Sequence, residues 1–209
     1  MSKGRAVAKK WPLQQLVGIG AVLALPLGLA ACSSSNEALV AAADTGFVAG
    51  DGSSISIPAS ERSAPVEFFG TDENGNTITN AEFLGNITVV NFWYAGCAPC
   101  RAEAADLNEA YAQWQGEGVR FLGVNTRDQA AQAKQFAAEF DVPYASIMDV
   151  ADGRAVQSAF AGAIPLNAVP TTLVLDREGR VAHRILGQIA GASQLSTMIK
   201  ETAAETAGS

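Results

Sequence analysis

The chain has 209 residues, of which 48% are hydrophobic and 17% charged, a composition typical of one globular domain with appended segments. A domain of this size buries enough apolar surface to fold without disulfide staples. Four positive charges lie within residues 1–31, so the chain from Cys32 onward has 10 Lys and Arg against 21 Asp and Glu, a net charge of −11. This negative surface excludes nucleic acid as an expected partner and disfavours direct binding to anionic lipid headgroups.

The N-terminal segment has the layout of an export signal, in which a basic start precedes an uncharged apolar stretch, Trp11–Cys32. About 20 apolar residues also suffice for a membrane-spanning helix, and a retained anchor is the alternative. The sequence LAAC, ending at Cys32, resembles the bacterial lipobox, whose cysteine is lipidated and becomes residue one after cleavage. We therefore expect residues 1–31 to be a lipoprotein signal peptide and Cys32 to anchor the protein on the extracytoplasmic face of the membrane.

Residues 32–63 are small and polar, and we expect them to form a flexible tether. The domain is expected over residues 64–209. Its first element is a hairpin whose tip is Asn74-Gly75, within the turn sequence TDENGN. The continuous apolar run ITVVNFWY that follows predicts a strand buried on both faces.

Helical spacing begins after this strand, with Cys100, Glu103, Leu107, Tyr111 and Trp114 at intervals of three and four. The next expected elements are a second buried strand (VRFLGVN), a helix over 129–140, a short strand (YASIM) and a helix over about 154–160. A hairpin of TTLVLD and RVAHRIL and a helix over about 193–202 complete the chain. This alternation predicts an α/β fold with a central mixed sheet flanked by helices.

Two of the three cysteines, Cys97 and Cys100, lie at the junction between the buried strand and the helix. A zinc site needs about four ligands, but the chain has no second cysteine pair. The only histidine, His183, lies in a distant strand segment, where we expect it to be exposed. Haem attachment requires a histidine at the position of Arg101. We therefore predict neither a metal nor another cofactor.

A structural disulfide and a redox-active pair remain as interpretations of this motif. The exported location is oxidising, which permits a structural bridge, but a loop this short restricts the unfolded chain little. At a helix N-terminus, backbone N–H groups and the helix dipole favour a thiolate on Cys97, and Cys100 lies one turn further on. A redox pair, with Cys97 exposed and Cys100 buried, is therefore favoured.

The motifs VVNFWYAGCAPC, AVPTTLVLD and REGR resemble the membrane-tethered TlpA/ResA-type thiol-disulfide oxidoreductases of the thioredoxin superfamily. The resemblance covers about residues 64–199 and implies a thioredoxin-like fold with an N-terminal β-hairpin. Three positions depart from common family residues. Gly96 replaces a tryptophan, Asn91 replaces the buried aspartate of thioredoxin itself, as is frequent in this branch, and Ala105 replaces a helix-kinking proline.

The resemblance also implies roles for individual residues. Cys97 is expected to attack a substrate disulfide, and Cys100 to resolve the mixed disulfide. Pro170 is expected to form a cis bond that faces the pair, with Pro165 as the rival position. Val169, Pro170 and Trp93 are expected to contact the substrate, Val169 through its backbone.

Glu103 lies on the otherwise apolar stripe of the helix that follows Cys97. A carboxylate is costly to bury, although an acidic residue near a helix start is also common at the surface. Because TlpA/ResA-type proteins have a glutamate at the matching position, we expect Glu103 to accept a proton from Cys100.

The function expected from these observations is reduction of disulfides in exported proteins, such as oxidised C-x-x-C-H sites of apocytochromes c. The oxidised pair would be re-reduced by a membrane thiol electron donor, and the protein is expected to act as a monomer. Ala98 and Pro99 supply no charge that would lower the thiol pKa, which favours a reductant. The alternatives are an oxidase of exported proteins, a peroxidase, and a non-catalytic binding lipoprotein.

Overall fold

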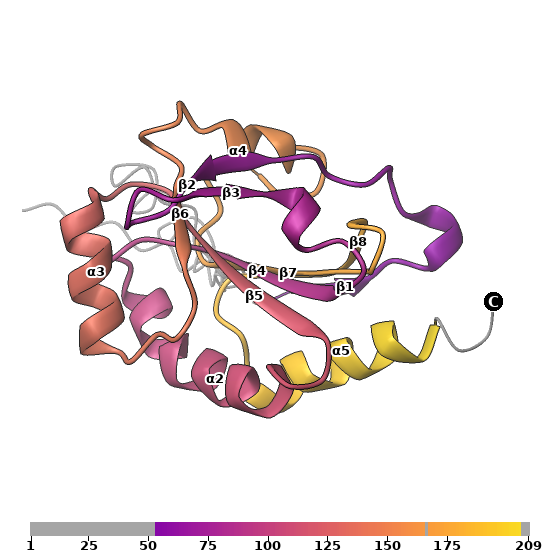
Figure 1. The fold of residues 1–209 in the computed structure, drawn as a ribbon. Helices are drawn as coiled ribbons and strands as arrows, with labels where there is room; N and C mark the ends of the chain where they lie inside the picture. Colours follow the sequence, from indigo (N-terminus) through magenta and orange to yellow (C-terminus); the bar gives the residue numbers. More distant parts are fainter. Residues whose placement is uncertain (1–52, 166, 206–209) are drawn as a thin grey trace, which may run out of the picture. The chain divides into compact units, whose positions relative to one another are not determined.

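The computed structural model describes residues 53–165 and 167–205, and these residues form a six-stranded sheet in the order β1-β8-β7-β4-β5-β6 and a separate hairpin, β2-β3 (Figure 1). The strands are β1 (Ser54–Ser56), β2 (Phe69–Thr71), β3 (Thr77–Thr79), β4 (Ile87–Trp93), β5 (Val119–Asn125), β6 (Ser146–Met148), β7 (Thr171–Leu175) and β8 (Val181–Leu186). The helices are α2 (Ala98–Trp114), α3 (Ala130–Glu139), α4 (Ala155–Ala159) and α5 (Ala192–Glu205), with short 3₁₀ turns at Ala59–Glu61 and Asn80–Glu82.

Strand β4 is the centre of the sheet, parallel to β5 and antiparallel to β7, and every one of its residues is buried. The prediction of a strand buried on both faces is therefore confirmed. Its side chains alternate, with Val89 in the core beneath α2 and α5 and Val90 in the core beneath the hairpin and α4. This alternation turns Asn91 and Trp93, at the carboxyl end of β4, toward the face on which α2 lies.

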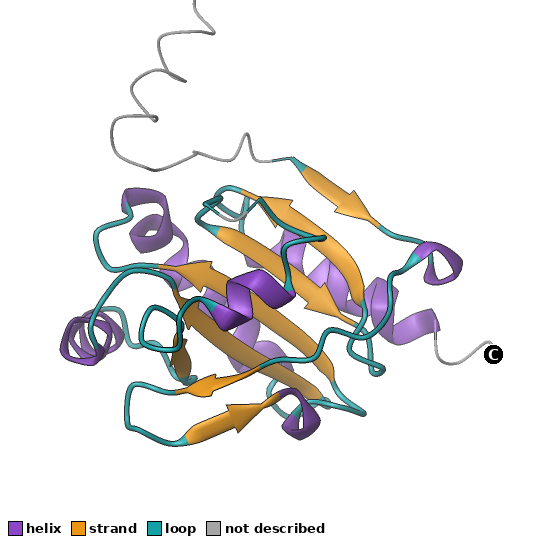
Figure 2. Ribbon diagram, turned by 90° about the horizontal axis from the view of Figure 1, so that it is seen from above, coloured by secondary structure: helices purple, strands orange, loops and turns teal. Residues whose placement is uncertain are grey.

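Helices cover both faces of the sheet, as the sequence predicted (Figures 1 and 2). Helices α2 and α5 pack on one face, and α4 and the β2-β3 hairpin on the other. Helix α3 packs beside α2, where Phe136 stacks on Trp93. The hairpin prediction is also confirmed, since Gly75 lies at its tip with a positive φ of 88° that favours glycine.

Part of the segment 32–63, which was expected to be a flexible tether, forms strand β1. Strand β1 pairs antiparallel with β8. Ile57 N–H donates to the Ala182 carbonyl at 2.8 Å, and Leu186 N–H donates to the Ser53 carbonyl at 2.9 Å. All three side chains of β1 are exposed. Strand β1 thus joins the sheet although it lies before the expected start of the domain at residue 64, because an edge strand can be held by backbone hydrogen bonds without an apolar pattern that the sequence would reveal.

His183 is buried, and the expectation that it is exposed is wrong. Its side chain lies in β8 opposite Ser56 of β1 and is only 2% exposed. The distance between His183 Nδ1 and Ser56 Oγ is 2.9 Å. Burial lowers the pKa of His183, while the negative charge of Glu201 on α5 opposes this shift.

The other predicted helices and strands are found within a few residues of their expected bounds. Helix α2 runs without interruption past Ala105, where a proline is common in the family. In the part of the chain that the structure describes, no helix is both long and apolar enough to cross a bilayer. The predicted signal segment 1–31 and Cys32 lie outside that part.

Candidate active site

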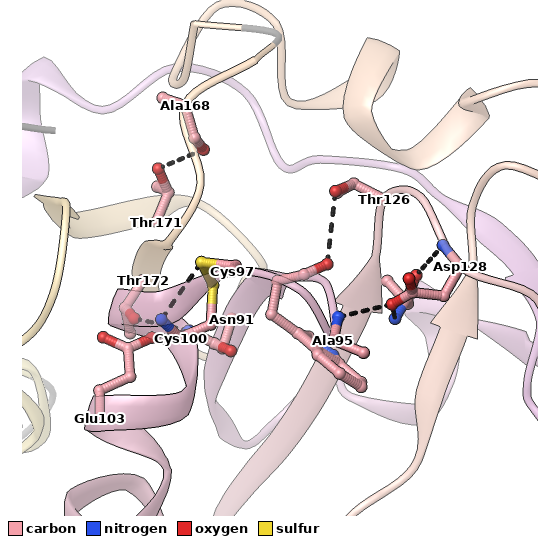
Figure 3. The surroundings of a disulfide bond; sticks show 12 residues. Asn91, Ala95, Cys97, Cys100, Glu103, Thr126, Asp128, Ala168, Thr171 and Thr172 are labelled. Atoms are coloured by element: carbon pink, nitrogen blue, oxygen red, sulfur yellow. Dashed lines mark hydrogen bonds between the residues drawn. A yellow bond between two sulfur atoms is a disulfide. The ribbon is translucent and has the colours of Figure 1, made fainter. Parts of the chain in front are cut away.

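Cys97 and Cys100 form a disulfide at the start of α2, with their Cα atoms 5.2 Å apart (Figure 3). Cys97 is the N-cap residue, and its Sγ accepts the backbone N–H of Cys100 at 3.2 Å. Pro99 stands in the first turn, where a missing N–H costs nothing because that group has no partner within the helix. In a reduced pair, the N–H groups at this helix start would stabilise a thiolate on Cys97.

Both cysteines are buried, which differs from the expectation of an exposed Cys97. Cys97 is 1% exposed and Cys100 is 3% exposed. They share a buried cluster with Trp93 and Val169, so the loop before β7 packs against the pair. Sequence position at a helix start could not reveal this packing, because Val169 lies more than 70 residues later in the chain.

The loop before β7 contains the proline that the sequence analysis selected. The Val169–Pro170 peptide bond is cis, as predicted, and no other cis bond occurs in the described residues. The neighbouring backbone is hydrogen-bonded on both sides, since Thr171 Oγ1 donates to the Ala168 carbonyl and Gly187 N–H donates to the Pro170 carbonyl, each at 2.8 Å. Pro165, the rival candidate, is exposed.

Glu103 is completely buried one turn beyond Cys100. Its Oε1 accepts a hydrogen bond from Asn91 Nδ2 at 2.9 Å, and its Oε2 accepts one from the backbone N–H of Ile189 at 2.9 Å. Burial raises the pKa of Glu103 to about 7, although the hydrogen bonds from Ile189 and Asn91 oppose that shift. The structure thus places at the redox pair a carboxyl group that changes charge near neutral pH.

Asn91 connects this carboxyl group to the sheet. Its Nδ2 also donates to Thr172 Oγ1 of β7 at 3.1 Å. A small cavity of about 10 Å³, the room of about one water molecule, lies beside Cys100 and is lined by Asn91 and Tyr144 among others. A water molecule in this cavity would lie between Cys100 and Asn91, the residue whose amide donates to Glu103.

Trp93 belongs to the same buried cluster as the pair and is 5% exposed. Its indole N–H donates to Ser146 Oγ at 3.0 Å, and its ring stacks on Phe136 with centroids 4.3 Å apart. The glycine at position 123 makes room for this arrangement, because a Cβ there would collide with Ser146 Oγ and Trp93 Nε1. These are the contacts of a core residue, and substrate contact by Trp93 stays a prediction.

The structure adds two residues that sequence reasoning missed, Thr126 and Asp128, in the loop between β5 and α3. Thr126 donates to the Trp93 carbonyl through its N–H at 3.0 Å and its Oγ1 at 3.3 Å, and Asp128 Oδ2 accepts the Ala95 N–H at 2.6 Å. Figure 3 shows the Thr126 Oγ1 and Asp128 hydrogen bonds. The only available signal was their position after a buried strand, where side chains meet at the carboxyl edge of a parallel pair. Within residues 53–165 and 167–205, no group of three or more His, Cys, Asp or Glu has the arrangement of a metal site.

A family model described as AhpC/TSA matches residues 61–184, more than half of the chain. The chain belongs to the AhpC/TSA family. This AhpC/TSA chain is similar to the thiol-disulfide oxidoreductase ResA of Bacillus thuringiensis, with 29% identity over 121 residues that cover 58% of this chain and 66% of ResA. Over 106 residues it is 36% identical to the thiol:disulfide interchange protein HelX of Rhodobacter capsulatus, covering 50% of this chain and 54% of HelX.

The AhpC/TSA chain is also similar to a solved structure, that of a DsbF homologue from Corynebacterium diphtheriae. The TM-score is 0.61 at 29% identity, and the match covers 74% of this chain and 97% of that one. The thioredoxin-like fold and the resemblance to ResA-type proteins are thereby confirmed. The matched regions span between about half and two thirds of the two curated relatives.

Proposed function

We propose that the protein is a lipid-anchored, extracytoplasmic thiol-disulfide oxidoreductase that reduces disulfides of exported proteins. The observation that carries the proposal is the Cys97–Cys100 disulfide at the N-terminus of α2, packed against Val169 and one turn from the buried Glu103. The names of ResA and HelX refer to the same thiol-disulfide chemistry. The anchor is supported by the apolar N-terminal stretch and the LAAC sequence that ends at Cys32.

In the proposed reaction, the Cys97 thiolate attacks one sulfur of the substrate disulfide and forms a mixed disulfide, releasing the other substrate sulfur as a thiolate. Cys100 then loses its proton and attacks Cys97 Sγ. The second substrate thiolate leaves, and the Cys97–Cys100 disulfide forms. The substrate gains two electrons and the cysteine pair loses two, so a membrane dithiol donor must return two electrons for each cycle.

Glu103 supports the second step as a proton acceptor for Cys100. A carboxyl with a pKa of about 7 is partly ionised at neutral pH and can take up the thiol proton. The cavity lined by Cys100 and Asn91 has room for a bridging water. The ionised carboxylate also opposes a thiolate on either cysteine, which stabilises the disulfide relative to the reduced pair and favours a reductant.

The substrate is proposed to approach the loop before β7 and to pair with the backbone of Val169 beside Pro170, by strand addition. Oxidised C-x-x-C-H sites of apocytochromes c are the substrates that the resemblance to TlpA/ResA-type proteins implies, and the protein is proposed to reduce them as a monomer. The net charge of −11 beyond residue 31 supports partners that present positive charge, not nucleic acid.

The test of the proposal is a redox titration of the folded protein, with the Cys97–Cys100 state measured by mass spectrometry. We expect a reduction potential below about −250 mV, in the range of reducing thioredoxin-type pairs. A potential above about −150 mV would indicate an oxidase. A pair that dithiothreitol does not reduce in the native protein would indicate an inert bridge and a non-catalytic function.

Two variants test the roles of the cysteines. Cys97→Ser is expected to abolish exchange with a disulfide substrate, because the attacking sulfur is removed. Cys100→Ser is expected to accumulate a mixed disulfide at Cys97, because the second step cannot occur. Non-reducing gels and peptide mass spectrometry identify the trapped species, and accumulation with Cys97→Ser instead would reverse the two roles.

A further inference from the structure

The turn that leads into α2 determines where the first cysteine of the pair lies. Cys97 N–H donates to the Tyr94 carbonyl at 3.1 Å, which closes a turn of four residues directly before the helix. Cys97 is then the N-cap residue whose Sγ accepts the Cys100 N–H. Any shift of the turn therefore moves Cys97 relative to the N–H groups that would stabilise its thiolate.

The loop between β5 and α3 holds this turn at two points (Figure 3). Thr126 N–H donates to the carbonyl of Trp93, the residue before the turn, at 3.0 Å. Asp128 Oδ2 accepts the N–H of Ala95, the second residue of the turn, at 2.6 Å. A hydrogen bond to a carboxylate is about twice as strong as one between neutral groups, so Asp128 makes the stronger of the two contacts.

The Asp128 side chain is itself fixed by Asn125, which is completely buried at the end of β5. Asn125 Nδ2 donates to Asp128 Oδ2 at 2.8 Å, and Asn125 Oδ1 accepts the backbone N–H of Asp128 at 2.8 Å. One carboxylate oxygen thus accepts both the Ala95 N–H and the Asn125 amide. The rigid sheet is thereby connected through two residues to the turn before Cys97.

We propose that Asp128 is a positioning residue for Cys97, acting through its hydrogen bond to Ala95. This inference rests on the proposed redox function of the pair. With the turn held, Cys97 Sγ keeps its contact with the Cys100 N–H, and the thiolate form of Cys97 stays stabilised. Without this hydrogen bond, the turn loses its link to β5, and the thiolate loses part of its stabilisation.

Three substitutions separate hydrogen-bond geometry from charge. Asp128→Ala removes the acceptor, and Asp128→Asn removes the charge but keeps an oxygen that can accept both N–H groups. Asp128→Glu keeps the charge but displaces the oxygen by one methylene. Asp152→Ala is the matched control, because Asp152 Oδ2 likewise accepts a backbone N–H, that of Thr71 at 2.8 Å, in the hairpin on the other face of the sheet.

The measurements are the rate of disulfide exchange and the pH profile of alkylation at Cys97 in the reduced full-length protein, read from the Cys97 peptide by mass spectrometry. We expect Asp128→Ala to slow exchange at least about tenfold, since small displacements of reacting groups have large kinetic costs. The alkylation profile should move to higher pH. Asp128→Asn should stay within about threefold of the wild type, and Asp128→Glu should resemble Asp128→Ala.

Urea unfolding of each variant separates a loss of fold from a loss of positioning. If Asp128→Ala does not fold, the contrast between Asp128→Asn and Asp128→Glu still decides the question. The proposal is overturned if all three substitutions at position 128 leave the exchange rate and the alkylation profile equal to those of Asp152→Ala, or if Asp128→Glu restores both and Asp128→Asn does not. A wild-type protein without exchange activity, whose alkylation profile still responds to these substitutions, would overturn the proposed function and leave the positioning role intact.

Discussion

Glu103 connects the stability of the folded chain to pH, because its carboxyl group is buried without a positive partner in its two hydrogen bonds. In an unfolded chain the group ionises near its ordinary pKa of 4.5, whereas in the folded protein its pKa is about 7. Between pH 4.5 and pH 7, Glu103 is therefore ionised in the unfolded chain but protonated in the folded protein. The free energy of unfolding therefore falls as pH rises from about 4.5 to 7, by up to about 3 kcal/mol.

We predict that Glu103→Gln removes this fall and slows the resolving step about 100-fold, because an amide cannot accept the Cys100 proton. Urea unfolding at pH 5 and pH 8 measures the first effect, and stopped-flow decay of the mixed disulfide measures the second. His183 acts in the opposite direction, since its lowered pKa makes stability rise as pH increases toward 6.5. The difference between wild type and variant isolates the contribution of Glu103.

Glu109→Gln is the control for this prediction, because Glu109 is exposed on the same helix. Glu109→Gln should retain the wild-type rate of the resolving step. It should also retain the change of that rate near pH 7 that the ionisation of Glu103 is expected to cause. An unchanged rate and inflection in Glu103→Gln would assign Glu103 a structural role only.

At the scale of single residues, the sequence was sufficient for the residues that a local pattern or a family motif identifies. Glu103 was visible as a carboxylate on an apolar helical stripe, and Pro170 as the proline before a buried strand. The burial of Cys97 and the contact of Asp128 with Ala95 depend on loops that meet only in the folded chain. No spacing rule within one element could have predicted them.

Among the secondary-structure elements, the segment that follows β1 is held to the domain by Arg62. Its side chain is 1% exposed. The guanidinium pairs with Asp176 at 3.0 Å and with Glu205 of α5 at 2.7 Å, and it donates to the Ile57 carbonyl. Arg180 also pairs with Asp176, at 2.8 Å. Arg62 thus connects the N-terminal segment, the turn between β7 and β8, and the last helix.

We predict that Arg62→Ala lowers the free energy of unfolding by about 2 kcal/mol, less than the loss of a partner from an isolated buried pair, because Arg180 still neutralises Asp176. Urea unfolding measures the change. Arg120→Ala, which removes an exposed arginine of β5, should change stability by less than about 0.5 kcal/mol. Equal effects of the two substitutions would show that the Arg62 pairs do not stabilise the fold.

Strands and helices with a strong pattern were predicted well, whereas strand β1, which has little pattern, was missed. The central strand β4 is a continuous apolar run, and α2 has a regular buried stripe. Strand β1 has only the sequence Ser-Ile-Ser, and its partner β8 lies about 130 residues away in the chain. The same pairing explains the error on His183, which β1 covers with Ser56.

For the molecule as a whole, the acidic chain beyond residue 31 has no electrostatic attraction to an anionic membrane, so the proposed location depends on lipid at Cys32. We predict that Cys32→Ala leaves the export segment uncleaved and abolishes lipid attachment. Mass spectrometry of the N-terminal peptide from purified membranes measures both effects. A wild-type protein that still contains residues 11–29 in its membrane-bound form would contradict the lipobox interpretation.

The pairing of β1 with β8 also sets how far from the bilayer a lipid-anchored domain could work. The chain between Cys32 and residue 53, which directly precedes β1, is about 20 residues long, whereas a boundary at residue 64 would have left about 30. A fully extended chain spans at most about 3.5 Å per residue, so the start of the domain would stay within about 75 Å of the membrane surface instead of about 110 Å. The Cys97–Cys100 pair would then reach the disulfides of an exported protein only near the membrane surface, close to the site where that protein emerges from the membrane.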